Sequence, residues 1–219
     1  MEKHDVGIIL QGAVSDWTKK IVEEYQQNFP DSQILLSTWN TENTTDIPCD
    51  VIKLEPPNDP YHINHQIIGS REGLKKINSE IIMKCRTDQF IHNKEVFQIF
   101  NSGCSKNKIM ISNFTTFTNV DYWASDLCQI GYRDTLLDFW RSIKLFDGSW
   151  NPIPEIYFTA NYIIKGKKDL RPWPEIIKEY FYVKDYNNDF QIEWKTMTPE
   201  WNIKRFFDLF YNKCCLPDE

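Results

Sequence analysis

Arg86 and Asp88 stand two residues apart directly after an apolar run. That run, residues 79–85, contains isoleucines, a methionine and a cysteine, which predicts a strand buried on both faces. Open α/β sheets bind their ligands beyond the carboxyl ends of such strands. A guanidinium can donate two parallel hydrogen bonds to two phosphate oxygens, and a carboxylate can hold a divalent cation. This pattern therefore favours a diphosphate ligand. The alternative is an ordinary strand end with a surface ion pair.

The flanking sequence predicts an α/β fold. Short β-branched apolar runs predict strands at residues 6–10, 33–39 and 50–54, and the first two are separated by a helix that ends near Pro30. Strands and helices in this order are typical of nucleotide-binding α/β folds. The absence of a Gly-x-Gly-x-x-Gly motif argues against a dehydrogenase. Later elements are predicted as helices within 58–78, 94–100 and 132–146, a strand at 108–112, and a hairpin of residues 181–185 and 190–194.

Composition limits the classes of protein and partner. The chain has 219 residues, 41% of them hydrophobic, which is enough for one domain with a proper core. A net charge of -6 gives no electrostatic basis for a nucleic-acid partner. The six cysteines show neither metal-ligand spacing nor disulfide-scaffold density, so reduced thiols in a cytoplasmic protein are expected.

Two features of the sequence concern membrane association. No run of eighteen apolar residues is present, so no membrane-spanning helix is expected. Residues 202–215 combine aromatic and basic side chains, which is compatible with peripheral contact at the inner face of a membrane. The alternative is a helix that docks on its own domain.

Several short motifs in order resemble the WavE lipopolysaccharide-synthesis family and related capsule-type GT-A glycosyltransferases. The resemblance covers residues 6–162. The matching motifs are Gln11-Gly12, Leu36-Ser37-Thr38-Trp39, Asn64-His65-Gln66-Ile67 with Gly73-Leu74, Lys84-Cys85-Arg86-Thr87-Asp88-Gln89, Asp121-Tyr122-Trp123 with Ser125-Asp126 and Gly131, and Pro154-Glu155-Ile156-Tyr157.

The resemblance implies a transferase that moves a sugar from a nucleotide-diphosphate donor to a hydroxyl of a surface glycan, of lipopolysaccharide-core or capsule type. It implies a single GT-A domain with a mostly parallel sheet flanked by helices, in which residues 1–112 bind the donor and 113–219 the acceptor. It also implies Mn²⁺ or Mg²⁺ on the diphosphate. Where the usual motif is Asp-x-Asp, this chain has Arg86-Thr87-Asp88. Either Asp88 binds the metal, or Arg86 and Arg71 neutralise the diphosphate directly.

The resemblance also suggests roles for other residues. Glu155 is the first candidate for the catalytic base, because Pro152 and Pro154 fix the loop before it and its place late in the chain suits the acceptor side, and Asp126 is the second. A retaining enzyme would not need this base. Gly12 has no side chain, so the backbone there can approach a ligand closely. The residues expected to meet the nucleotide are Gln11, Gly12 and Ser37, and those expected to hold the ribose or diphosphate are Asn64, Gln66 and Arg71.

Two other functions remain open on the sequence alone. A sugar-phosphate nucleotidyltransferase shares much of this architecture, but it uses an N-terminal glycine-rich loop with a basic residue, and residues 11–14 provide neither. A catalytically inactive carbohydrate-binding or scaffolding relative would keep the aromatic residues and need no diphosphate site.

Overall fold

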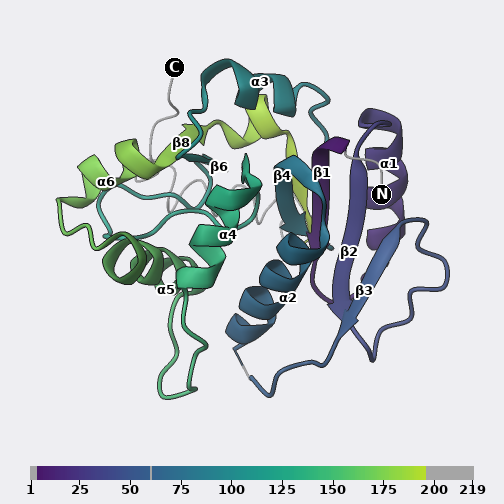
Figure 1. The fold of residues 1–219 in the computed structure, drawn as a ribbon, viewed down its shortest axis with the longest axis horizontal. Coiled ribbons are helices and arrows are strands. Elements are labelled where there is room, and N and C mark those ends of the chain that lie inside the picture. Colours follow the sequence, from purple (N-terminus) through teal and green to yellow (C-terminus); the bar gives the residue numbers. More distant parts are fainter. Residues whose placement is uncertain (1–3, 60, 196–219) are drawn as a thin grey trace.

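A seven-stranded sheet forms the centre of the computed structural model, which describes residues 4–59 and 61–195 (Figure 1). Its order is β3 (Asp50–Leu54), β2 (Gln33–Trp39), β1 (His4–Gln11), β4 (Ser79–Arg86), β7 (Gln129–Tyr132), β6 (Ile109–Ser112) and β8 (Phe181–Lys184). Strand β7 runs antiparallel to both of its neighbours, and the other pairings are parallel. The predicted mostly parallel α/β fold is therefore confirmed, with β4 in the middle of the sheet.

Helices cover both faces of the sheet because side chains along each strand alternate in direction. In β1, Ile8 and Leu10 pack in one core cluster, and Ile9 packs in the other. The first cluster lies under α1 (Thr18–Asn28) and α3 (Val96–Gly103). The second lies under α2 (Ile63–Lys76), α4 (Arg133–Ser142), α5 (Pro154–Ala160), the π-helical turn η1 (Asn161–Lys167) and α6 (Trp173–Tyr180).

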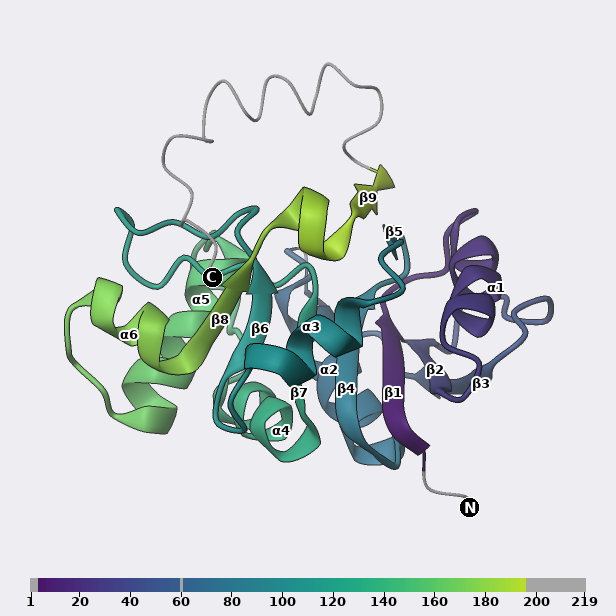
Figure 2. The same cartoon turned by 90° about the horizontal axis from the view of Figure 1, so that it is seen from above.

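A small second sheet joins two distant parts of the chain. Strand β5 (Gln89–Ile91) pairs antiparallel with β9 (Ile192–Trp194), and both lie beyond the ends of β1 and β4 (Figure 2). The predicted hairpin is therefore wrong, because β8 joins β6 in the main sheet. Between β8 and β9, the Asp185 carboxylate accepts hydrogen bonds from the amides of Asn187 and Asn188, which starts the π-helical turn η2 (Tyr186–Phe190) where a hairpin turn was expected.

The structure tests the predictions about cysteines and membrane-spanning helices only within residues 4–59 and 61–195. Cys49, Cys85, Cys104 and Cys128 form no disulfide within the described residues. No helix within residues 4–59 and 61–195 is both long enough and apolar enough to cross a membrane. The predicted segment at 202–215, with the last two cysteines, lies outside the described residues.

Helix α2 anchors the loop between α4 and α5. The Asn64 amide donates to the Phe146 carbonyl at 2.9 Å and accepts from the Phe146 N–H at 2.7 Å. Arg71 donates from Nε to the Trp140 carbonyl at 2.7 Å and from its other end to the Ile143 carbonyl. These bonds fix the loop of residues 143–153, which leads directly into Glu155.

Asn64→Ala should lower the free energy of unfolding by about 2–3 kcal/mol, since it leaves both buried polar groups of Phe146 without a partner. Urea unfolding measures this change. Asn151→Ala, which removes an exposed amide from the same loop, should change stability by less than about 0.5 kcal/mol. Equal losses in the two variants would contradict the anchoring role of Asn64.

Candidate active site

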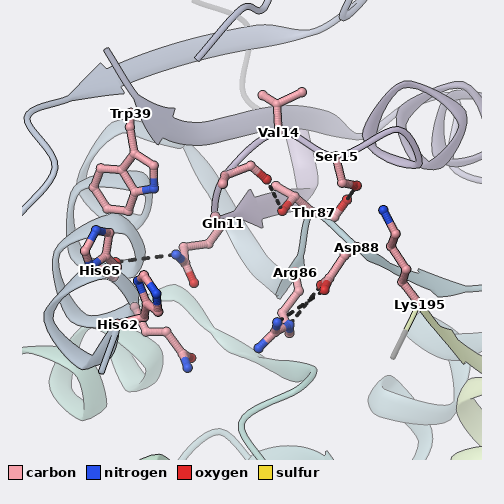
Figure 3. A pocket seen from close by; sticks show the side chains of 13 residues that line it. Gln11, Val14, Ser15, Trp39, His62, His65, Arg86, Thr87, Asp88 and Lys195 are labelled. Carbon is pink, nitrogen blue, oxygen red and sulfur yellow. Dashed lines mark hydrogen bonds and ion pairs between the residues drawn. The ribbon is translucent and has the colours of Figure 1, made fainter. Parts of the chain in front are cut away.

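A pocket of about 380 Å³ opens at the carboxyl ends of β1, β2 and β4 (Figure 3). This is the edge at which parallel α/β sheets bind ligands. The loop after β1, the first turn of α2 and the turn after β4 supply most of its wall. The lining residues are Gln11, Gly12, Ala13, Val14, Ser15, Trp39, His62, His65, Gln66, Arg86, Thr87, Asp88 and Lys195.

Gly12 allows the loops after β1 and β4 to meet. Its φ of +138° lies in a region that L side chains rarely adopt, and a Cβ there would come within 2.9 Å of Thr87 Oγ1. The Thr87 hydroxyl in turn donates to the Ala13 carbonyl at 2.6 Å. A side chain at position 12 would therefore separate the two loops that form the floor of the pocket.

One end of the pocket is aromatic and carries unsatisfied polar atoms. The ring centroids of Trp39 and His65 are 4.8 Å apart, and those of His62 and His65 are 4.9 Å apart. Burial, with nearby His62, lowers the pKa of His65, so its imidazole is neutral at pH 7. His65 Nδ1 and Gln66 Oε1 are buried and have no hydrogen-bond partner within the described residues. Such atoms are rare in folded proteins, and these two have no accessible surface, although other atoms of both residues line the pocket.

The other end of the pocket is charged. Arg86 Nε donates to Asp88 Oδ1 at 2.9 Å, and Nη2 donates to Oδ2 at 3.3 Å. The Trp194 ring covers the Arg86 guanidinium, 5.4 Å away, and the indole N–H donates to Asp88 Oδ2 at 3.4 Å. The ion pair expected of an ordinary strand end is thus present, but it lines a pocket and is partly buried.

A cluster of buried charge continues from Arg86 toward α5. Lys84, in β4, is fully buried, donates to the Asp126 carbonyl at 3.1 Å and lies over the Trp140 ring. Burial lowers the pKa of this lysine. Burial, and then the neighbouring Asp126 carboxylate, raise the pKa of Glu155 to about 8, although Arg86 acts to lower it. Both predicted base candidates are therefore within electrostatic range of Arg86, but neither of them lines the pocket.

Three residues that were predicted to bind the nucleotide contact other parts of the protein. The buried Ser37 hydroxyl donates to the Gly69 carbonyl at 2.7 Å. Asn64 and Arg71 hold the loop of residues 143–153, as described above. None of the three lines the pocket. Gln11, Gly12, Gln66 and Arg86 do line it, and their roles in binding stay predictions.

Other lining residues were not predicted. Trp39 and His65 stood within motifs already noted, directly beside residues that were chosen, so their aromatic character was the available signal. Lys195 gave no signal, because it reaches the pocket only through the pairing of β9 with β5. The local sequence around Lys195 cannot predict that pairing, because β5 lies far away in the chain.

The described residues fit a resident metal ion poorly. Asp88 supplies the one carboxylate in the pocket lining, and both of its oxygens accept hydrogen bonds. Within residues 4–59 and 61–195, no group of three or more His, Cys, Asp or Glu side chains could hold a metal. The binding of Mn²⁺ or Mg²⁺ by Asp88 stays a prediction, and no catalytic step proposed below depends on it.

A model of one protein family matches residues 8–168, well over half of the chain. The chain belongs to the WavE lipopolysaccharide synthesis family. This confirms the family resemblance drawn from the motifs. A search of curated protein sequences found no match for the chain.

Solved structures share the fold of this WavE family member at low sequence identity. A glycosyltransferase involved in glycosylation of the major capsid of PBCV-1 aligns with a TM-score of 0.52 and 12% identity, over 91% of this chain and 98% of that chain. S. aureus TarS (residues 1–349) aligns with a TM-score of 0.50 and 12% identity, over 94% of this chain and 64% of that chain. These matches establish the fold.

The high pKa of Glu155 should make the protein less stable as pH rises. Its folded pKa of about 8 exceeds the usual 4.5, so the carboxyl group's stabilising contribution is complete below pH 4.5 and is lost as pH rises through 8. Glu155→Gln cannot ionise. As the pH rises from 5 to 9, the free energy of unfolding of Glu155→Gln minus that of the wild type should increase by about 2–4 kcal/mol.

Urea unfolding at several pH values measures this difference. Glu175→Gln, which removes an exposed carboxylate from α6, controls for the general effect of losing one negative charge. Parallel stability curves for the wild type and Glu155→Gln would contradict the burial of an ionisable Glu155.

Proposed function

We propose that this protein is a glycosyltransferase that uses a nucleotide-diphosphate sugar to glycosylate a hydroxyl of a surface glycan, of lipopolysaccharide or capsule type. One observation supports this most strongly. The pocket combines an aromatic end with an arginine at a strand end, and the carboxylates of Asp126 and Glu155 lie outside the pocket lining within electrostatic range of that arginine. Membership of a lipopolysaccharide synthesis family agrees with a glycan product.

The aromatic end suits a nucleobase. Trp39 and His65 offer ring surfaces, and Gln66 Oε1 and His65 Nδ1 are the buried atoms that need partners. A base presents both donors and acceptors along its edge, so after a rotation of these side chains it can hydrogen-bond to them while its ring contacts aromatic side chains. In the proposed complex, the diphosphate then extends along Gly12 toward Arg86.

Arg86 is the residue proposed to stabilise the leaving group. When the sugar is transferred, the bond between the anomeric carbon and the diphosphate oxygen breaks, and the electron pair stays on the diphosphate. A guanidinium stabilises this developing charge through paired hydrogen bonds. The Trp194 ring restricts the position of Arg86, so little reorganisation is needed at that moment.

Glu155 is the proposed base in a single displacement. The acceptor hydroxyl oxygen forms the new bond to the anomeric carbon, and its proton passes to Glu155. A carboxylate with a pKa near 8 takes a proton more readily than one near 4.5. The adjacent Asp126 charge supports this by raising the pKa of Glu155, so the two carboxylates have different roles.

Nucleotide binding tests the proposal through thermal unfolding with UDP, GDP, CDP and CMP sugars, each in EDTA and in Mn²⁺. A ligand at a hundred times its dissociation constant stabilises by about 2.7 kcal/mol, which is a clear rise in melting temperature. We expect one class of nucleotide to give this rise. No rise with any of them would contradict a nucleotide-sugar site.

Gln66→Ala tests the base end of the pocket with the same assay. Loss of the Gln66 side-chain amide, which belongs to a residue lining the pocket, should weaken the binding of the preferred nucleotide about tenfold, because a typical hydrogen bond contributes about 1 kcal/mol. Gln27→Ala, which removes an exposed amide from α1, should bind as the wild type does. Equal affinity in both variants would show that Gln66 does not contact the nucleotide.

A further inference from the structure

We propose that Lys195 is the second cation of the diphosphate site, and that Arg86 and Lys195 together bind the donor's diphosphate without a metal ion. The inference rests on the proposed function and adds a binding residue to the same pocket. Lys195 lies beyond the part of the chain that the family model matches. The sequence suggested Arg71 as the second cation for the diphosphate, and we assign that role to Lys195. The Arg71 guanidinium instead donates to backbone carbonyls of α4 and the following loop.

The backbone fixes Lys195 beside the pocket. Strand β9 pairs with β5 so that Trp194 lies opposite Gln89, and the Lys195 N–H donates to the Asp88 carbonyl at 3.1 Å. Residue 195 is thus tied to the turn that carries Arg86 and Asp88. Figure 3 shows Asp88 between the side chains of Arg86 and Lys195, so the two cations flank one carboxylate at the charged end of the pocket.

Two side chains hold this strand in place. Trp194 covers Arg86 and donates to Asp88, so it connects the strand to the ion pair. His92, at the end of β5, lies between Glu24 of α1 and Glu193 of β9, with nitrogen to oxygen distances of 2.7 Å and 3.0 Å. Lys195 therefore extends from a strand anchored on both sides, which lowers the entropy lost when it binds a ligand.

The charges at this end of the pocket favour an anion. Arg86 and Lys195 line it with one carboxylate, Asp88. Lys195 Nζ also pairs with Asp16, whose side chain is 74% exposed. An exposed ion pair contributes little, so a doubly charged diphosphate can replace Asp16 as the partner of Lys195 at small cost. Asp88, whose oxygens already accept from Arg86, orients that guanidinium and need not carry a cation.

Lys195→Met tests the proposal, because it keeps the aliphatic stem and removes the charge. Isothermal titration in EDTA, with UDP, GDP and CDP as probes, should show a ten- to hundredfold weaker affinity for the nucleotide that the wild type prefers. Lys195→Arg should recover most of the affinity. Lys178→Met, on the exposed face of α6, should bind as the wild type does.

Asp88→Asn separates the two ways of neutralising the diphosphate. In EDTA this variant should bind the nucleotide at least as tightly as the wild type, because a competing negative charge is gone. Binding by the wild type that requires Mn²⁺ and is lost in Asp88→Asn would overturn the metal-free site. Unchanged affinity in Lys195→Met would overturn the role of Lys195 and leave the proposed function standing. Absence of binding to the wild type would overturn both.

Discussion

Charge buried at the carboxyl end of β4 is the constraint on which the rest of the site depends. Lys84 is fully buried in the central strand, and Arg86 follows it at the strand's end. An unpaired charge in such a position costs several kcal/mol, so each needs a partner brought by another element. The turn after β4 brings the Asp88 carboxylate to Arg86, and the segment before β7 brings the Asp126 carbonyl to Lys84, while α5 brings Glu155 under the influence of Asp126 and Arg86. The fold thereby gathers the polar and titratable groups that the proposed diphosphate site and the proposed base require.

Helix α2 contributes both to the pocket in which a nucleobase is proposed to bind and to the loop that precedes Glu155. Its first turn presents His65 and Gln66 to the pocket, where a nucleobase is proposed to bind. From the same helix, Asn64 and Arg71 hold the loop that leads to Glu155. Asn64 and Arg71, which sequence motifs placed at the ligand, therefore anchor backbone instead, and this anchoring positions the carboxylate that is proposed as the base.

Sequence predicted the fold well wherever a signal was local. The β-branched runs gave β1, β2, β3 and β4, and the polar cluster after β4 did mark the pocket. Strand β7 was missed because its four residues have little apolar pattern and its place is set by the strands on either side. Polar residues of α2 were harder to assign, since a helical pattern cannot show whether a side chain meets solvent, ligand or backbone. Lys195 depends on a pairing between distant segments, which no local pattern encodes.

Release of nucleoside diphosphate from nucleotide sugars, without any added acceptor, tests the central claim most directly. A transferase with a base near the anomeric carbon transfers the sugar slowly to water. The account predicts slow release from one nucleotide-sugar class by the wild type, and loss of that release in Glu155→Gln with nucleotide binding retained. A protein that binds the nucleotide sugar but releases no diphosphate above the uncatalysed rate would contradict the account and indicate a binding module.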